Sequence, residues 1–338
     1  MTENSTRNNP IEMAQEMAQA AKAALQSFIE KIKSAQRQKF VFLLVGRTGV
    51  GKSSTVNSLM GKEIAQVGDD EATTMDVKAY DGEINNIEFT IFDTPGLCDD
   101  VEEAGNDKNY LELMQSKVSE LDLMWFVSRL DETRVTGDEK RGIKLISEAF
   151  TPKIWEHAII VFTYANSVKP EKYKEKLAKR TELIRKEISK FTDDEIANNI
   201  PSLAVDNECR TTPDGKEWLG ELYTQIFARM NEKGILPFLI ATADRINKSR
   251  KNQESKDPNW RFYGEDEQCV GVGAQYEIPK INFDDIQKNI IKKKMIDAGI
   301  IPALMLGGAA IGSVFGPVGT VIGGAVGAAV GCVSWLWD

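Results

Sequence analysis

The sequence predicts an α/β fold in which a mostly parallel sheet is covered by helices on both faces. Short apolar runs alternate with helical patterns through the middle of the chain, as expected when strands and covering helices follow one another. The first run, residues 39–45 (KFVFLLV), is continuously apolar after its opening lysine, which is typical of a strand buried on both faces. A glycine-rich loop joins this strand to the first of the helices.

Composition limits the classes of partner. The 338-residue chain is 42% hydrophobic and 28% charged, and its net charge of -9 makes it a poor ligand for nucleic acid. One histidine and four cysteines without CxxC spacing give no support for a zinc site or a disulfide framework. The N-terminus has an early acidic residue and no apolar core, unlike a secretory signal. These features favour a reduced protein that faces the cytosol.

Residues 1–37 are predicted to be an N-terminal tail followed by an amphipathic helix. Residues 1–9 are polar, and between Ile11 and Ile32 the apolar side chains recur at steps of three and four. We expect this helix to pack on the next domain. Self-association and membrane contact are the alternatives.

The predicted nucleotide domain spans residues 38–234. After the strand at 39–45 a helix begins at Lys52, and residues 77–93 form a hairpin that turns between Gly82 and Asn86. Three more apolar runs follow, with helical patterns between them, of which the longest is rich in charge. The three runs are residues 121–128, 157–163 and 201–205, and the charge-rich helical segment is residues 170–191.

The loop GRTGVGKS matches the phosphate-binding pattern G-x-x-x-x-G-K-[ST], with its strand and helix in the required places. The glycines allow main-chain N–H groups to curl around phosphates at a helix N-terminus. Lys52 is expected to reach the β- and γ-phosphates, and the Ser53 hydroxyl to bind Mg²⁺. The predicted nucleotide contacts from this loop are Gly46, Arg47, Thr48, Gly49, Val50, Gly51, Lys52, Ser53 and Ser54.

A second element, DTPG, ends the strand EFTIFD. Asp93 at the tip of that strand is expected to serve the outer shell of the metal, and the Gly96 amide to sense a γ-phosphate. In the intervening EATTMD, either Thr73 or Thr74 is expected to complete the magnesium shell, although either can instead be a strand-edge residue. Together with the loop, DTPG indicates a P-loop GTPase, with Lys52, Thr74 and Gly96 among its catalytic residues.

The residue after Gly96 bears on the rate of hydrolysis. Leu97 stands where many GTPases carry a glutamine that orients the attacking water, and an apolar side chain cannot do so. The sequence therefore predicts slow intrinsic hydrolysis that needs a partner or a second copy.

Over residues 38–234 the chain resembles the septin-related GTPases, and within them the AIG1-type (immune-associated nucleotide-binding) proteins and the chloroplast outer-envelope import (Toc) GTPases. The resemblance rests on GRTGVGKSS, DTPGLCDD and the box RLDETRVTGDE. It implies GTP specificity, dimerisation across the nucleotide face and frequent membrane association. It also implies that Arg134 contacts the partner's nucleotide. The alternative for Arg134 is a surface arginine paired with Asp131 or Asp138.

The base-recognition segment departs from the usual N/T-K-x-D. Asn166 falls at the position of the aspartate and offers only a neutral acceptor, while Tyr164 is placed to stack on the base. The segment VDNE resembles the fifth motif of the family, and there Asn207 is a further expected contact. Either Glu208 or Asp206 can supply the missing carboxylate. GTP and GDP are the expected ligands, rather than adenine nucleotides.

Residues 235–297 are assigned to a linker and a small region without readable chemistry, and residues 298–338 to an apolar, glycine-rich tail. No charged side chain occurs between residues 298 and 337, a run longer than the roughly 20 residues that span a bilayer. Glycines recur at every fourth position, and Pro317 divides the run. A helical hairpin is expected, with a single span or a soluble pair of helices as alternatives. Lys292, Lys293 and Lys294 precede it as a positive flank.

These features combine into a membrane-anchored GTPase switch on a cytosol-facing membrane, with GTP/GDP and Mg²⁺ as cofactors and a homodimer or oligomer as its active form. A septin-like scaffold with fixed nucleotide is one alternative. A membrane-perturbing protein, whose glycine-rich tail is controlled by the nucleotide domain, is the other.

Overall fold

A computed structural model provides the structure. It describes residues 39–65, 78–85, 87–94, 112, 115, 120–246 and 281–300. The predicted N-terminal helix within residues 1–37 and residues 301–338 of the predicted tail lie outside the described residues.

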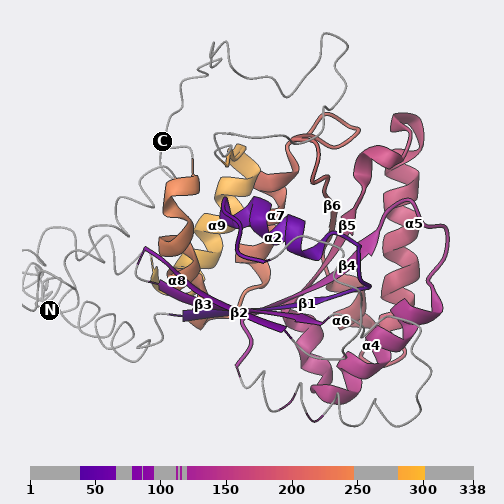
Figure 1. The fold of residues 1–338 in the computed structure, drawn as a ribbon, viewed down its shortest axis with the longest axis horizontal. Coiled ribbons are helices and arrows are strands. Elements are labelled where there is room, and N and C mark those ends of the chain that lie inside the picture. The colour runs from indigo at the N-terminus through magenta and orange to yellow at the C-terminus, as the bar shows by residue number, and fades with distance from the viewer. Residues whose placement is uncertain are drawn as a thin grey trace, which may run out of the picture.

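The described chain forms a six-stranded sheet in the order β2-β3-β1-β4-β5-β6 (Figure 1). All neighbouring strands are parallel except β2 and β3, so the predicted mostly parallel α/β sheet is confirmed. The carboxyl ends of the parallel strands share one edge of the sheet. The strands are β1 (Lys39–Val45), β2 (Lys78–Ile84), β3 (Ile87–Thr94), β4 (Leu123–Arg129), β5 (Ala158–Thr163) and β6 (Ser202–Ala204).

The β2–β3 hairpin turns later than predicted. Gly82 is paired with Phe89 inside the ladder, and the chain leaves β2 only at Asn85, which has a positive φ of 53°. A Cβ on Gly82 would lie 2.3 Å from the Phe89 ring, so the glycine makes room for a cross-strand aromatic side chain. The prediction of a turn beginning at Gly82 was wrong because this glycine serves packing rather than turning.

Helices cover both faces of the sheet, as predicted. The longest, α5, corresponds to the charge-rich segment, and α2 begins at Lys52. The α-helices are α2 (Lys52–Met60), α4 (Gly137–Ala149), α5 (Pro170–Ile188), α6 (Asp194–Asn199), α7 (Trp218–Arg229), α8 (Glu232–Thr242) and α9 (Asp285–Asp297). Short 3₁₀ helices are η1 (Pro152–His157), η2 (Ala165–Ser167) and η3 (Ala243–Arg245).

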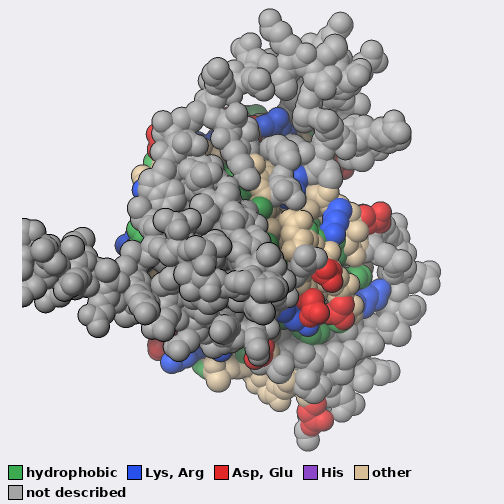
Figure 2. Space-filling view, turned by 90° about the vertical axis from the view of Figure 1, so that its left-hand side faces the viewer, with side chains coloured by type: hydrophobic (Ala, Val, Ile, Leu, Met, Phe, Trp, Pro, Cys, Tyr) green, Lys and Arg blue, Asp and Glu red, His purple; other side chains and the backbone are tan. Residues whose placement is uncertain are grey.

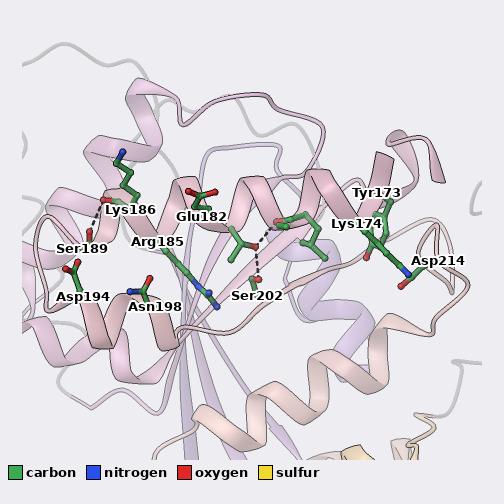
Figure 3. Close-up of a pocket in the computed structure, with 13 residues that line it drawn as sticks. Tyr173, Lys174, Glu182, Arg185, Lys186, Ser189, Asp194, Asn198, Ser202 and Asp214 are labelled. Carbon is green, nitrogen blue, oxygen red and sulfur yellow. Dashed lines mark hydrogen bonds between the residues drawn. The ribbon is translucent and has the colours of Figure 1, made fainter. Parts of the chain in front are cut away.

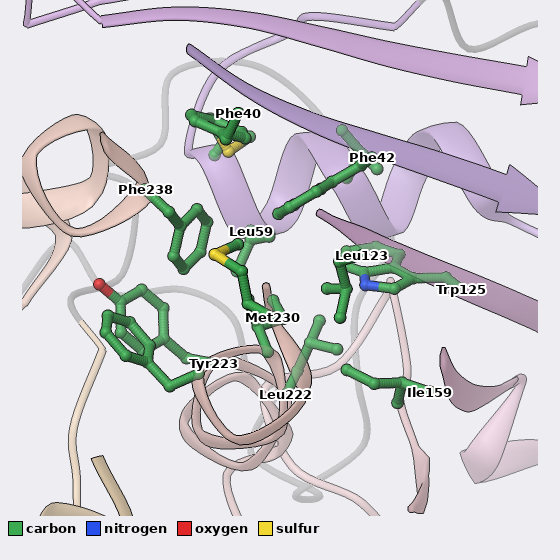
Figure 4. Close-up of a cluster of buried hydrophobic side chains, with 14 of the residues drawn as sticks. Phe40, Phe42, Leu59, Leu123, Trp125, Ile159, Leu222, Tyr223, Met230 and Phe238 are labelled. Atoms are coloured by element: carbon green, nitrogen blue, oxygen red, sulfur yellow. The ribbon is translucent and has the colours of Figure 1, made fainter. Parts of the chain in front are cut away.

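Alternate side chains of β1 enter two separate cores. Phe40 and Phe42 face the core beneath α2, α7, α8 and α9, where Phe238 of α8 packs edge-on against Phe40 (Figure 4). Val41 and Leu43 face the opposite core, which α4, α5, α6 and η1 cover. This division explains why the strand is apolar at every position from Phe40 to Val45.

The nucleotide domain extends beyond its predicted end. The boundary at residue 234 falls inside α8, whose Phe238 and Leu239 are fully buried in the sheet's core. Further along the chain, Ile291 and Met295 of α9 join the same core. Residues 235–246 and 281–300 are thus part of the domain, which corrects the assignment of these parts of residues 235–297 to a linker and a separate region.

Three further findings concern the predicted environment. Cys209 is disulfide-bonded, which corrects the expectation of fully reduced cysteines. Scattered cysteines carry no spacing signal for such a pair. Within the described ranges, the helices are all too short or too polar to span a bilayer. On the face shown in Figure 2, side chains of both charges are interspersed where the described surface is visible.

Candidate functional site

The glycine loop lies between β1 and α2, at the carboxyl edge of the sheet. Gly49 and Gly51 have positive φ values of 74° and 91°, a conformation that favours glycine. A Cβ on Gly46 would lie 2.3 Å from the Val127 carbonyl oxygen of the neighbouring strand. The glycines are therefore required by backbone conformation and close approach in the loop that leads into the N-terminus of α2.

Lys52 is the first residue of α2 and is only 5% exposed. Its ammonium group donates hydrogen bonds to the main-chain carbonyls of Gly46, at 2.8 Å, and Arg47, at 3.0 Å. Both acceptors belong to the loop itself. A phosphate oxygen bound at the loop would compete with these carbonyls for the same ammonium protons.

Asp93 is brought beside the loop by strand pairing, because β3 runs parallel to β1 with Asp93 opposite Leu44. Its Oδ1 lies 3.5 Å from Lys52 Nζ but makes no hydrogen bond in the described part of the chain. Burial raises the pKa of Asp93, although Lys52 opposes the shift. A buried carboxylate oxygen without a hydrogen bond fits a water of a magnesium shell, and the half-buried Ser53 hydroxyl would supply a direct ligand.

Two threonines missed by the sequence analysis fix the loop from outside. Thr163, at the end of β5, donates a hydrogen bond to the Val50 carbonyl at 2.7 Å. Thr55 on α2 donates to the Gly51 carbonyl at 2.8 Å and contacts the Asn207 amide. Asn207 also reaches Gly51 O at 3.3 Å, so this predicted contact lies against the loop. The sequence offered one signal that Thr163 belongs to the site, which is its position at the end of a predicted strand.

Tyr164 lies beside the glycine loop, two residues before Asn166, which is predicted to bind the base. It has a left-handed conformation with φ of 56°, and its hydroxyl donates to the Gly49 carbonyl at 3.2 Å. The Arg129 guanidinium stacks 3.9 Å from the centre of the tyrosine ring and is held there by a bidentate contact with Asp131. This contact raises the pKa of Arg129 and lowers that of Asp131. One face of Tyr164 is thus already covered by a cation.

Asn166 and the VDNE segment meet at the same edge. Asp206 is 7% exposed, and its carboxylate accepts hydrogen bonds from the main-chain amides of Asn166, Glu208 and Cys209 at 2.9–3.1 Å. It therefore shapes the loop and is not free for a base. Glu208 is exposed and remains the candidate carboxylate. The Asn166 side chain donates to Thr211 O at 3.0 Å, which leaves its own oxygen as an acceptor.

The box RLDETRVTGDE runs from the end of β4 into α4. Arg134 is exposed, and its side chain makes no ion pair with any residue that the structure describes. Asp131 is taken by Arg129, and Asp138 lies 3.7 Å from Arg47. Neither predicted alternative partner holds Arg134, whose guanidinium therefore points to solvent.

A partly buried ion cluster lies beneath the box, and the sequence analysis missed it; two of its side chains are buried and two are 27% and 19% exposed. We use this name for Arg47, Glu132, Glu139 and Arg180. Arg180 of α5 is 1% exposed and donates to Glu139 Oε1 at 2.8 Å, and Glu132 accepts from Arg47. Burial, followed by the nearby Glu139 carboxylate, raises the pKa of Glu132. No spacing rule predicts a buried arginine in a charge-rich helix.

Some predicted site residues lie outside the described residues. These are Thr73, Thr74, Gly96 and Leu97. Among the described ones, the structure brings together the loop, Asp93, Tyr164, Asn166, Asn207 and Glu208 along one edge of the sheet. Arg134 lies on the adjoining box.

A separate groove of about 690 Å³ lies on α5, α6 and β6 (Figure 3). It runs from Tyr173 and Asp214 at one end to Ser189 and Asp194 at the other, and Thr181 bonds Ser202 across its middle at 2.8 Å. None of its lining residues belongs to the glycine loop. The site is therefore defined by the loop and its neighbours rather than by this groove.

A phosphate cradle with a buried lysine lies beside an acidic strand tip, and the candidate base contacts follow along the same edge of a parallel sheet. This arrangement defines a P-loop GTPase domain.

Comparison with known proteins gives the family. Residues 41–208 match the sequence model of the AIG1 family, so the chain carries an AIG1-family GTPase domain and the resemblance is confirmed. GTP-binding protein A of Dictyostelium discoideum is 36% identical over 148 residues, which are 44% of this chain and 32% of that protein. Translocase of chloroplast 33 of Arabidopsis thaliana is 28% identical over 229 residues, 63% of this chain and 76% of the relative.

Solved structures give a weaker match. Toc33 from Arabidopsis thaliana in complex with GDP and Mg²⁺ is 27% identical, with 61% of this chain and 90% of that chain covered and a TM-score of 0.48. The Toc33 complex with Mg²⁺ and GMPPNP has the same scores.

Proposed function

We propose that this protein binds GTP with Mg²⁺, hydrolyses it slowly and acts as a dimerising switch on a membrane. The observation that carries the proposal is the phosphate cradle, with Lys52 buried at its centre and Asp93 3.5 Å away. The name GTP-binding protein A of the Dictyostelium relative supports a guanine nucleotide as the ligand.

Within this site the chain's own groups have separate roles. Lys52 would transfer its hydrogen bonds from the loop carbonyls to the β- and γ-phosphates, and the α2 N-terminus would add main-chain amides. Ser53 and Asp93, with Thr73 or Thr74, would hold Mg²⁺ and its waters. The metal would neutralise charge that develops on the phosphates.

Guanine selectivity is assigned to the edge beyond the loop. Asn166 offers an amide oxygen and Glu208 an exposed carboxylate, the acceptors that the ring N–H and amino group of guanine require. Adenine lacks the ring N–H donor at that position. Tyr164 would stack at the base side, with Arg129 on its opposite face.

The proposal that the protein dimerises rests on the box RLDETRVTGDE, which contains Arg134. Arg134 is exposed beside the loop, and its backbone carbonyl is fixed by Arg180 at 2.7 Å, so the chain direction at this residue is set. A guanidinium supplied by a second copy would compensate for an apolar Leu97 that cannot orient water. Hydrolysis would then be faster in the dimer than in the monomer.

Membrane attachment is proposed for the uncharged residues 298–337. The helix that leads into them, α9, presents Ile286, Ile290 and Ile296 at 72%, 36% and 45% exposure, together with an exposed Lys293. Apolar side chains beside a lysine suit the surface of an anionic bilayer.

The deciding experiment uses the full chain in mild detergent. Calorimetry with GDP should show binding that Lys52→Ala weakens by roughly ten- to hundredfold, because a charge-assisted contact to phosphate is lost. Lys62→Ala, at an exposed position, is the control. Sedimentation should then show a monomer with GDP and a dimer with a non-hydrolysable GTP analogue, and Arg134→Ala should lose concentration-dependent hydrolysis. Absence of purine nucleotide binding at millimolar concentration would refute the proposal.

A further inference from the structure

Glu132 connects the phosphate loop with the box. Its Oε1 accepts a hydrogen bond from the Arg47 guanidinium, and its Oε2 lies 3.9 Å from the buried Arg180 guanidinium. Oε2 makes no hydrogen bond within the described residues, so it interacts with Arg180 by charge alone. One carboxylate therefore joins an arginine of the loop to an arginine of α5.

Arg180 in turn forms hydrogen bonds with two residues of the box and with one residue of β4. Its guanidinium donates to the Arg134 carbonyl at 2.7 Å, to Ser128 Oγ at 2.7 Å and to Glu139 Oε1 at 2.8 Å. Glu139 also forms the capping box that starts α4, by accepting from the Thr136 amide. The backbone of Arg134 is thus fixed by a hydrogen bond from a buried arginine.

The loop end of the connection contains a hydrogen bond for which a phosphate would compete. Lys52 donates to the main-chain carbonyl of Arg47, the residue whose side chain binds Glu132. A phosphate that attracts Lys52 would remove that main-chain bond. The change would reach Glu132 through the Arg47 side chain.

We propose that Glu132 is a positioning residue that couples occupancy of the phosphate loop to the presentation of Arg134 toward a second copy of this chain. The coupling runs from Arg47 through Glu132 to Arg180. The proposal rests on the proposed function, because it requires nucleotide-dependent dimerisation through the box.

The test compares Glu132→Gln with Glu175→Gln in the full chain. The first substitution keeps the shape of the side chain and removes its charge. The second removes an exposed glutamate that borders the same small hollow as Glu132. Two quantities are measured: the dissociation constant for GDP, and the dimer dissociation constant in the presence of a non-hydrolysable GTP analogue.

Glu132→Gln should leave GDP affinity within about twofold and weaken the dimer by roughly tenfold, since coupling between sites is typically 5- to 150-fold. Glu175→Gln should match the wild type in both. A Glu132→Gln dimer as tight as the wild type would overturn the inference while the proposed function stands. A wild type that binds nucleotide but stays monomeric would overturn the dimer part of the proposed function and the inference with it.

The Glu132 Oε2 atom is buried beside Arg180, and loss of its charge can impair folding, so a second variant is needed. Replacing Arg47 and Glu132 together by methionine removes both charges of this half-buried pair, so that neither partner is left without the other. At saturating nucleotide this double variant should also dimerise at least about tenfold more weakly than the wild type. Equal dimerisation would contradict the inference.

Discussion

At the scale of single residues, the charged form of Asp93 destabilises the folded protein. Its carboxylate is buried and only partly compensated by Lys52, as its raised pKa indicates. Residues that lower stability where a ligand binds are typical of functional sites. Asp93 fits this description because its ligand would be a metal-bound water.

Asp93→Asn should therefore show a pH-dependent gain in stability without nucleotide. Between the ordinary pKa of 3.8 and the raised pKa of the folded state, the folded protein binds more protons than the unfolded one, so wild-type stability falls as pH rises through this window. The advantage of the variant should grow as pH rises from the ordinary pKa through the raised one, as measured by urea titrations at both ends of this window. An advantage that is equal at both ends would contradict this explanation.

At the scale of elements, the loop is defined by steric fit as much as by sequence pattern. Gly46→Ala places a methyl group 2.3 Å from a backbone oxygen of β4, which cannot move without the strand. We expect a loss of about 1–3 kcal/mol in the free energy of unfolding. Gly137→Ala, where a Cβ meets nothing within 4 Å, is the control and should be close to neutral in thermal melts.

Helix α8 provides a second prediction at this scale. Phe238 contacts Phe40, Phe42, Tyr223 and Phe227 in the core, although it lies beyond the predicted domain boundary. Phe238→Ala should cost about 3–5 kcal/mol by urea denaturation, as expected for an aromatic side chain in a packed core. If α8 were part of a linker, the substitution would have little effect, as Lys233→Ala should on the exposed side.

At the scale of the whole molecule, the prediction concerns the membrane. The full chain should float with vesicles that contain anionic lipid, because the uncharged residues 298–337 exceed one bilayer span. A chain ending at residue 297 should bind weakly and lose binding as salt rises, since only α9 and its lysines remain. Recovery of the full chain in the soluble fraction without detergent would favour a soluble pair of glycine-rich helices.

Some features follow from short stretches of sequence. The 39–45 run forms β1 with the predicted bounds, and Lys52 begins α2, because local periodicity and the glycine pattern carry this information. The placement of Asp93 beside the loop also follows, since a parallel pair brings the carboxyl ends of two strands together. These are consequences of backbone geometry.

Other features depend on contacts between residues far apart in the chain. The sequence by itself determined the α/β class, the phosphate loop and the AIG1-type resemblance, because each is written in neighbouring residues. Only the tertiary structure decided that α8 and α9 complete the core and that Arg180 fixes the box. Packing partners and buried charge pairs are chosen by the folded topology, where a residue's environment comes from elements that its neighbours in sequence do not reveal.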